Sequence, residues 1–192
     1  MKCPSCANVL NEPASRCPAC KFTLLRADLK FGAIPRHSRY LSDRSGRLEL
    51  DEIAELREGL QLFEKKFPQS LFSVFVADLP SGSSVKEYAF WLSNRARFSP
   101  SEKRLGENLD ILLVIDVGSE TAALTTGYGL EKHLAEDDLQ DALDALAKAA
   151  AKGDVVAGIW TCIETITGRL RELSMDLGRK KTRPARTADA II

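Results

Sequence analysis

The 192-residue sequence has few of the residues on which several kinds of function depend. It has only two histidines, so histidine-rich metal sites are excluded and any histidine catalysis would use His37 or His133. Five cysteines are too few for a fold held together mainly by disulfides. The longest uninterrupted apolar run, 111–115, falls far short of the roughly 20 residues of a membrane-spanning helix, so no integral membrane segment is predicted.

The sequence also has no overall excess of positive or negative charge, because its 27 basic and 27 acidic side chains balance. The distribution is uneven: residues 1–26 carry a formal +3, residues 178–192 carry +4, and residues 27–177 carry −7. An acidic body repels polyphosphate, so no specific nucleic acid is expected as a partner. Since no apolar segment typical of a secretory signal follows Met1, a cytoplasmic protein is predicted.

Two short cysteine motifs stand at the N-terminus. They are Cys3-Pro4-Ser5-Cys6 and Cys17-Pro18-Ala19-Cys20, separated by ten residues. Zinc binds four thiolates at tetrahedral angles, and two such turns supply these ligands in pairs. A pair of disulfides would require an oxidising compartment, and a thioredoxin-like motif occurs once, ahead of a helix. Residues 1–25 are therefore predicted to form a minimal structural zinc ribbon.

The ribbon is too small to bury a core, so the metal should supply most of its folding energy. We expect loss of the zinc to disorder residues 1–25 and to leave the body nearly unchanged. The basic ribbon could contact nucleic acid, but the scarcity of aromatic residues favours a structural cap or a protein-docking unit. The fifth cysteine, Cys162, lies on an apolar helix face and is predicted to be inert core.

The body shows alternating helix and strand patterns after a linker at 26–39. Residues 26–50 lack sustained periodicity and are predicted as linker and loop. The expected elements are a helix at 51–67 with Asp51 as its N-cap, a strand at 71–77, a helix at 84–97, a strand at 110–116, a strand at 121–126, and helices at 137–151 and 155–176.

This α-β-α-β-β-α-α order predicts an α/β domain at 40–177 with a small mixed sheet flanked by helices. A strand–helix–strand crossover makes the first two predicted strands parallel, and the hairpin adds an antiparallel edge strand. Residues 178–192 are predicted to be a basic disordered tail.

Three segments resemble the TPM domain family of thylakoid-lumen photosystem-repair proteins and their bacterial relatives. They are Asp43-Arg44-Ser45-Gly46-Arg47-Leu48, Asn108-Leu109-Asp110-Ile111-Leu112-Leu113-Val114, and Thr126-Gly127-Tyr128-Gly129-Leu130-Glu131. The last contains the family's GYGLE turn letter for letter, and the resemblance covers 40–173. It implies a bacterial protein with acid phosphatase activity and divalent-metal binding. Two departures are Glu136, where members usually have Asp, and a zinc ribbon in place of a signal peptide or membrane helix.

The predicted topology creates two candidate sites. At the carboxyl ends of the parallel strands, Asp78, Asp116 and the turn at 81–84 could hold an anion, or their side chains could simply cap local structure. The apolar strand that ends in Asp116 is similar to the aspartyl phosphatase signature, in which a second Asp follows two residues later. Gly118 stands at that second position, so the general acid is missing.

The amino end of the central strand collects the residues that match the family. Asn108, Asp110 and Glu131 should converge there, approached by Asp43 and Glu136, as oxygen ligands for calcium or magnesium. A purely structural role is the alternative, in which the glycines adopt positive φ, Tyr128 packs and Glu131 caps a helix.

Two functions follow from this interpretation. In the first, the chain is a protein- or metal-binding module in assembly or repair that docks to another protein through its ribbon or tail. In the alternative, it is a weak divalent-metal-dependent acid phosphatase that hydrolyses phosphate esters, with Asn108, Asp110 and Glu131 holding the cation.

Overall fold

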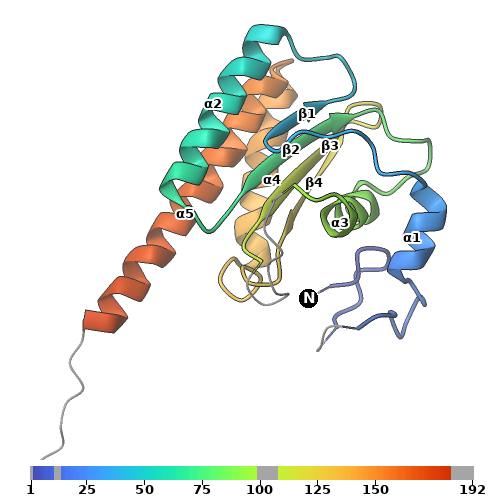
Figure 1. The fold of residues 1–192 in the computed structure, drawn as a ribbon, viewed down its shortest axis with the longest axis horizontal. Helices are drawn as coiled ribbons and strands as arrows, with labels where there is room; N and C mark the ends of the chain where they lie inside the picture. The colour runs from blue at the N-terminus through green and yellow to red at the C-terminus, as the bar shows by residue number, and fades with distance from the viewer. Residues whose placement is uncertain (1, 11–13, 99–107, 183–192) are drawn as a thin grey trace, which may run out of the picture.

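The computed structural model describes residues 2–10, 14–98 and 108–182 as three layers (Figure 1). A four-stranded sheet lies in the middle. One face is covered by α2, α4 and α5, and the other by α1, α3 and the N-terminal ribbon. The elements are α1 Leu24–Phe31, β1 Leu41–Asp43, α2 Leu50–Lys66, β2 Phe72–Ala77, α3 Val85–Arg95, β3 Ile111–Asp116, β4 Thr121–Thr126, α4 Glu136–Ala150 and α5 Val155–Thr182.

The sheet has the strand order β1-β2-β3-β4. β1 and β2 are parallel, β2 and β3 are parallel, and β3 pairs with β4 in an antiparallel hairpin. Every residue of β2 and β3 is buried, which explains their unbroken apolar runs. The predicted α/β fold with a small mixed sheet is confirmed.

The face under α2, α4 and α5 has a core built entirely from the body of the chain. Leu56 and Leu60 of α2 and Ile159 and Ile166 of α5 are fully buried against it. Cys162 is also buried, as predicted, and burial raises the pKa of its thiol to about 12. No helix in the described ranges combines the length and apolar character that crossing a membrane requires.

The opposite face has a second core, and the ribbon belongs to it. Cys3, Cys17 and Phe22 from the N-terminal segment pack in one cluster with Trp91 and Leu92 of α3. From the sheet, this cluster contains Phe75, Ala77, Leu112, Val114 and Ala123. The ribbon is thus part of the layer that covers the sheet.

Several boundaries differ from those expected. Helix α1 begins at the end of the predicted ribbon and continues into the predicted linker, and strand β1 lies in the predicted loop. The N-cap of α2 is Glu49, whose N–H donates a hydrogen bond of 2.7 Å to the Glu52 carboxylate, so the prediction of Asp51 was wrong. Helix α5 continues to Thr182, into the predicted tail, and residues 183–192 lie outside the described ranges.

Candidate metal centre and adjoining cavity

The four predicted cysteines converge at one point. The Sγ atoms of Cys3 and Cys20 are 3.6 Å apart, and those of Cys6 and Cys17 are 3.8 Å apart. A tetrahedral zinc with Zn–S bonds of about 2.3 Å requires S–S separations of about 3.8 Å, whereas a disulfide requires about 2.05 Å. All four ligand atoms lie within 4.8 Å of one another, so the cluster fits a metal such as zinc.

The two cysteine turns have matching backbone geometry. The N–H of Ala7 donates to the carbonyl of Cys3 at 2.9 Å, and the N–H of Lys21 donates to that of Cys17 at 3.0 Å. Ala7 and Lys21 both have positive φ, at 57° and 62°. The Cys17 N–H in turn donates to the carbonyl of Phe22 at 2.9 Å. Both turns thus present their thiols in the same way, and the second one fixes the position of Phe22.

The segment after the ribbon anchors it to α3. The ring of Phe22 meets the ring of Phe90 edge-on at 5.9 Å. Asp28 of α1 accepts hydrogen bonds from Trp91 Nε1 at 2.9 Å and from Arg95 at 2.8 and 2.6 Å. The Arg95 guanidinium and the Trp91 indole hold the pKa of Asp28 below its usual range despite its desolvation.

A cavity of about 420 Å³ opens at the far end of α3, on the same face of the sheet as the ribbon. It lies beside the amino ends of β2 and β3, where Ser73 and Asp110 line its floor. The remaining lining includes Phe90, Ser93, Asn94, Ala96, Arg97 and Phe98 from α3 and beyond, and Asn108, Thr125, Thr126, Gly127, Tyr128 and Glu131. The cavity therefore brings together Asn108, Asp110 and Glu131 of the five predicted oxygen ligands.

The GYGLE turn is held against the segment that leads into β3. The N–H groups of Gly127 and Gly129 donate to the carbonyls of Asp110 and Asn108 at 2.7 and 2.8 Å. A Cβ on Gly127 would lie 2.4 Å from the Asn108 carbonyl oxygen, so only glycine fits. Neither glycine has positive φ, so close backbone approach explains Gly127, and the predicted left-handed turn was wrong.

Glu131 does not have the capping role that the structural alternative gave it. The carboxylate that bonds the backbone ahead of α4 is Asp138, which accepts from the Ala135 N–H at 3.0 Å. Glu131 instead lines the cavity, where desolvation raises the pKa of its carboxyl group. Burial, and then the charge of Glu131, raise the pKa of Tyr128.

The cavity brings together three side chains with oxygen donors. Asn108 Oδ1 accepts from the Asp110 N–H at 2.9 Å, and Asp110 Oδ1 accepts from the Leu71 N–H at 3.1 Å. These bonds fix both side chains on the strand. The C-terminal end of α3, with its negative dipole, adjoins them at Ala96. Two carboxylates and one amide suit calcium or magnesium, with the weak affinity that a low ligand charge gives.

Asp43 lies at the wrong end of the sheet for this cavity. It pairs with Val76 at the carboxyl end of β2, four residues beyond Phe72, which is roughly 13 Å along a strand. Because β1 runs parallel to β2, Asp43 cannot approach Asp110, and its predicted membership was wrong. Its carboxylate instead closes the following loop by accepting from Ser45, Gly46 and Leu48 at 2.6 to 3.0 Å.

Glu136 is the second predicted ligand that does not line the described cavity. It is exposed at the start of α4 and forms an ion pair with Lys2 of the ribbon at 2.5 Å. The Lys2 ammonium lowers the pKa of its carboxyl group. The prediction that Glu136 joins the cation ligands was wrong, because its exposed side chain points to the ribbon and pairs there with Lys2.

The carboxyl end of the sheet has a structural arrangement. Asp116 is buried and accepts from Leu79 N–H at 3.1 Å, Gly118 N–H at 3.2 Å and Ser119 Oγ at 2.6 Å. Ser84 caps α3 by accepting from the Glu87 N–H at 3.3 Å. These contacts match the capping interpretation of Asp116 and the turn at 81–84.

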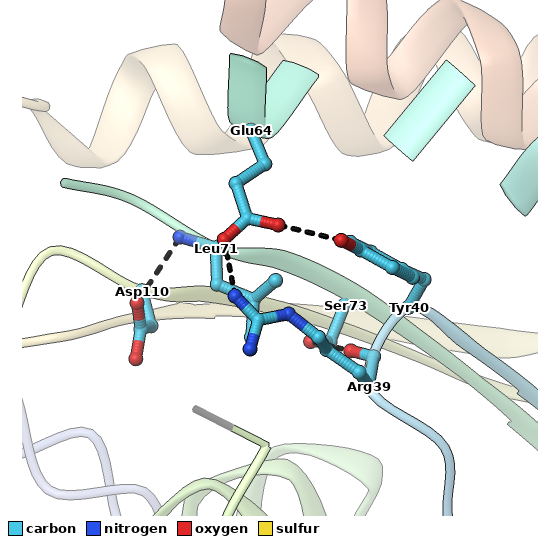
Figure 2. A network of polar contacts seen from close by, with 6 residues as sticks. All are labelled: Arg39, Tyr40, Glu64, Leu71, Ser73 and Asp110. Atoms are coloured by element: carbon cyan, nitrogen blue, oxygen red, sulfur yellow. Dashed lines mark hydrogen bonds and ion pairs between the residues drawn. The ribbon is translucent and has the colours of Figure 1, made fainter. Parts of the chain in front are cut away.

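Behind the cavity floor lies a polar network that sequence reasoning missed (Figure 2). Glu64 reaches from α2 to pair with Arg39 and to accept from the Tyr40 hydroxyl at 2.6 Å. Ser73, which lines the cavity, donates to the Arg39 carbonyl at 2.7 Å. The network ties the segment leading into β1 to both α2 and β2, and no local sequence pattern links these residues.

Comparison with known protein families gives a match over the body of the chain. The family model described as the TPM domain matches residues 41–169. No curated protein gives a significant match.

Three solved NMR structures share the fold. An N-terminal domain from P. gingivalis has 17% identity and a TM-score of 0.60, covering 70% of this chain and 83% of its own. The BA42 protein of Bizionia argentinensis has 14% identity and a TM-score of 0.58, covering 68% and 86%. An N-terminal domain from Corynebacterium glutamicum has 11% identity and a TM-score of 0.52, covering 67% and 77%. Since the family model spans well over half of the sequence, the chain belongs to the TPM domain family.

Proposed function

We propose that the chain is a metal-binding TPM protein whose four-cysteine ribbon holds one structural zinc ion. The single observation that supports this most strongly is the S–S geometry of Cys3, Cys6, Cys17 and Cys20, which matches a tetrahedral thiolate site. When bound, zinc would supply charge neutralisation and folding energy to a segment too small to fold alone. A site of reduced thiols also suits the cytoplasm, the predicted location.

The test is metal analysis of the purified, reduced protein. We expect about one zinc per chain in the wild type and none in Cys17→Ser. Ser5→Ala, a change within the first cysteine turn that removes no ligand, is the matched control and should retain the zinc. Wild-type protein that folds with an ordered N-terminus and no metal would contradict the proposal.

We propose in addition that the cavity binds a divalent cation such as calcium or magnesium. Asn108, Asp110 and Glu131 would be the protein ligands, and the carbonyl end of α3 would add a favourable potential. Because only the folded protein brings these groups together, bound calcium should raise the melting temperature by mass action.

Calcium binding can be measured by calorimetry and by thermal melts after the ribbon is saturated with zinc. We expect a melting-temperature rise in millimolar calcium that is lost in Asp110→Asn. Asp78→Asn changes an exposed acid that follows β2 at the opposite end of the sheet, and should leave the response intact. Absence of a shift in the wild type would leave the cavity with no support as a cation site.

A role as a protein-binding module in assembly or repair stays part of the proposal. The ribbon and α1 expose Val9, Leu25 and Leu29, with 62%, 67% and 81% of their surfaces accessible. Apolar side chains of this kind suit a protein partner better than nucleic acid. Loss of partner capture in a Leu25→Ser, Leu29→Ser double variant that retains zinc would support docking through this surface.

The second candidate function is metal-dependent hydrolysis of phosphate esters. Arg97 lines the same cavity as Asp110 and Glu131, so a guanidinium is available for phosphoryl oxygens beside the cation ligands. Cys162 offers no nucleophile, since it is buried in the other core. Hydrolysis of a generic aryl phosphate that requires added divalent metal, and that Asp110→Ala abolishes in a folded protein, would favour this function.

A further inference from the structure

The zinc ligands are connected to the cavity through a short series of contacts. Cys17 holds the Phe22 carbonyl through its N–H at 2.9 Å, and the Phe22 ring packs on Phe90 at 5.9 Å. Phe90 itself lines the cavity, as do Ser93 and Asn94 one turn later on α3. One pair of aromatic rings therefore separates the second cysteine turn from the cavity wall.

Helix α1 provides a second connection to the same wall. Its N-cap, Thr23, accepts from the Arg26 N–H at 3.1 Å and stands three residues beyond the last cysteine, Cys20. Asp28, one turn further, holds Trp91 and Arg95 of α3 through three hydrogen bonds of 2.6 to 2.9 Å. Besides its packing on the sheet, α3 is thus held next to the cavity by a helix that begins directly at the ribbon.

The ribbon also contacts the chain a few residues beyond the opposite wall of the cavity. Lys2 pairs with Glu136 at the start of α4, five residues after Glu131. This ion pair is exposed and contributes little by itself, but it lies beyond the turn that carries Gly127 and Tyr128. The ribbon therefore touches α3, which lines the cavity, and the start of α4, which follows the other wall in the chain.

We propose that zinc loading of the ribbon controls the affinity of the cavity for divalent cations. With zinc bound, Phe22 and Asp28 hold α3 in the position that forms the cavity wall. Without zinc, the cysteine turns lose the constraint that places Phe22, and α3 is freed to move away from the sheet. Calcium binding must then also order the cavity wall, so the apparent affinity for calcium is lower.

This inference rests on the proposed zinc and cation sites and assigns a regulation to them. Coupling between two ligands is reciprocal, so calcium should tighten zinc binding by the same factor by which zinc tightens calcium binding. Typical couplings between sites correspond to about a 5- to 150-fold change in affinity. Phe22→Leu, which keeps all four thiols and shortens the contact with Phe90, should retain zinc and lose most of the coupling.

The experiment compares zinc-loaded and zinc-free protein under reducing conditions, with one equivalent of zinc so that the cavity receives none. Calcium affinity is measured by calorimetry, and backbone amide signals are followed by NMR without calcium. We expect calcium to bind about 5- to 150-fold more tightly to the zinc-loaded protein. Zinc removal should also shift the amide signals of Ser93, Asn94 and Gly127. Leu25→Ala, an exposed change on α1, is the control and should keep the full coupling.

Each outcome separates the inference from the proposals beneath it. Equal calcium affinity with and without zinc, and NMR changes confined to residues 2–31, would overturn the coupling while the cation site stands. If calcium does not bind at either zinc level, the cation proposal fails, and the coupling of affinities fails with it. If zinc tightens calcium binding to Phe22→Leu by as much as it does in the wild type, the assigned path through Phe90 is contradicted.

Discussion

The two faces of the sheet are covered by layers of different kinds. On one face, α2, α4 and α5 bury a core of apolar side chains that all come from the body of the chain and almost all from the matched family domain. On the other face, α3 is covered by α1 and by a ribbon that cannot fold by burial alone. The first layer is built from packed helices alone, whereas the second includes a candidate metal site outside the family domain. The cavity lies on the second face, where α3 and the residues after it form one wall.

The largest expected effect comes from removing a zinc ligand on the metal-dependent face. Cys17→Ser should abolish zinc binding and unfold the ribbon, with loss of packing on Trp91 and Leu92. The cost should reach several kcal/mol, below the roughly 10–16 kcal/mol that zinc supplies to isolated zinc fingers. Chemical denaturation followed by tryptophan fluorescence measures it.

This outcome separates two descriptions of the ribbon. Sequence reasoning expected an independent unit whose loss leaves the body unchanged, whereas the shared core predicts a lower free energy of unfolding for the body as well. A Cys17→Ser protein with the wild-type unfolding transition would show that the ribbon is an independent unit and that the body does not need it for stability.

An intermediate effect is expected on the other face from Gly59→Ala in α2. A Cβ at this position would lie 2.0 Å from the ring of Trp160 in α5, so the two helices would have to separate. Such overpacking costs about 1–3 kcal/mol. The measurement is the free energy of unfolding, with zinc content as the control. Zinc loss in this variant would show that the two layers are not independent.

The smallest expected effect concerns Asp43 and acid stability. Burial alone would raise the pKa of Asp43, but the hydrogen bonds from Ser45, Leu48 and Gly46 outweigh it and lower the pKa below its usual value. A depressed folded-state pKa adds stability above the unfolded value of about 3.9, and this stability is lost as pH falls through the folded value. Asp43→Asn should therefore reduce stability at neutral pH and flatten its decline in acid.

Melts between pH 2 and pH 7 test this prediction. Asp78→Asn, which alters an exposed acid at the same end of the sheet, serves as the control and should follow the wild-type profile. Equal acid sensitivity in Asp43→Asn and wild type would mean that the loop from Ser45 to Leu48 does not depend on the ionised carboxylate.

Much of the fold could be predicted because its signals are local. The apolar run from Ile111 to Ile115 and the turn that follows it specify a buried strand and a hairpin. The sequence also contains a signal for helix α1 that the prediction missed, because Thr23 and Gly32 are typical N-cap and C-cap residues. In the structure Gly32 has φ 72° and Ala27 is buried. Strand β1 has only three residues, too few to show a period.

The candidate site was predictable only in part, because its geometry depends on long-range pairing. Asn108 and Asp110 were correctly brought together with the turn at Glu131, since the hairpin register follows from the turn. Asp43 was misplaced because the direction of the short strand β1 cannot be read from its residues. The contact of Phe22 with Phe90 links segments 68 residues apart, and no local pattern predicts it.

The most direct test of the dependence of one face on zinc is hydrogen exchange of the wild-type protein with and without the metal. We expect chelation of zinc to remove protection from α1 and α3 and to leave the amides of α2 and the buried part of α5 protected. Retained protection of α3 in the zinc-free protein, with changes confined to the cysteine turns, would contradict it.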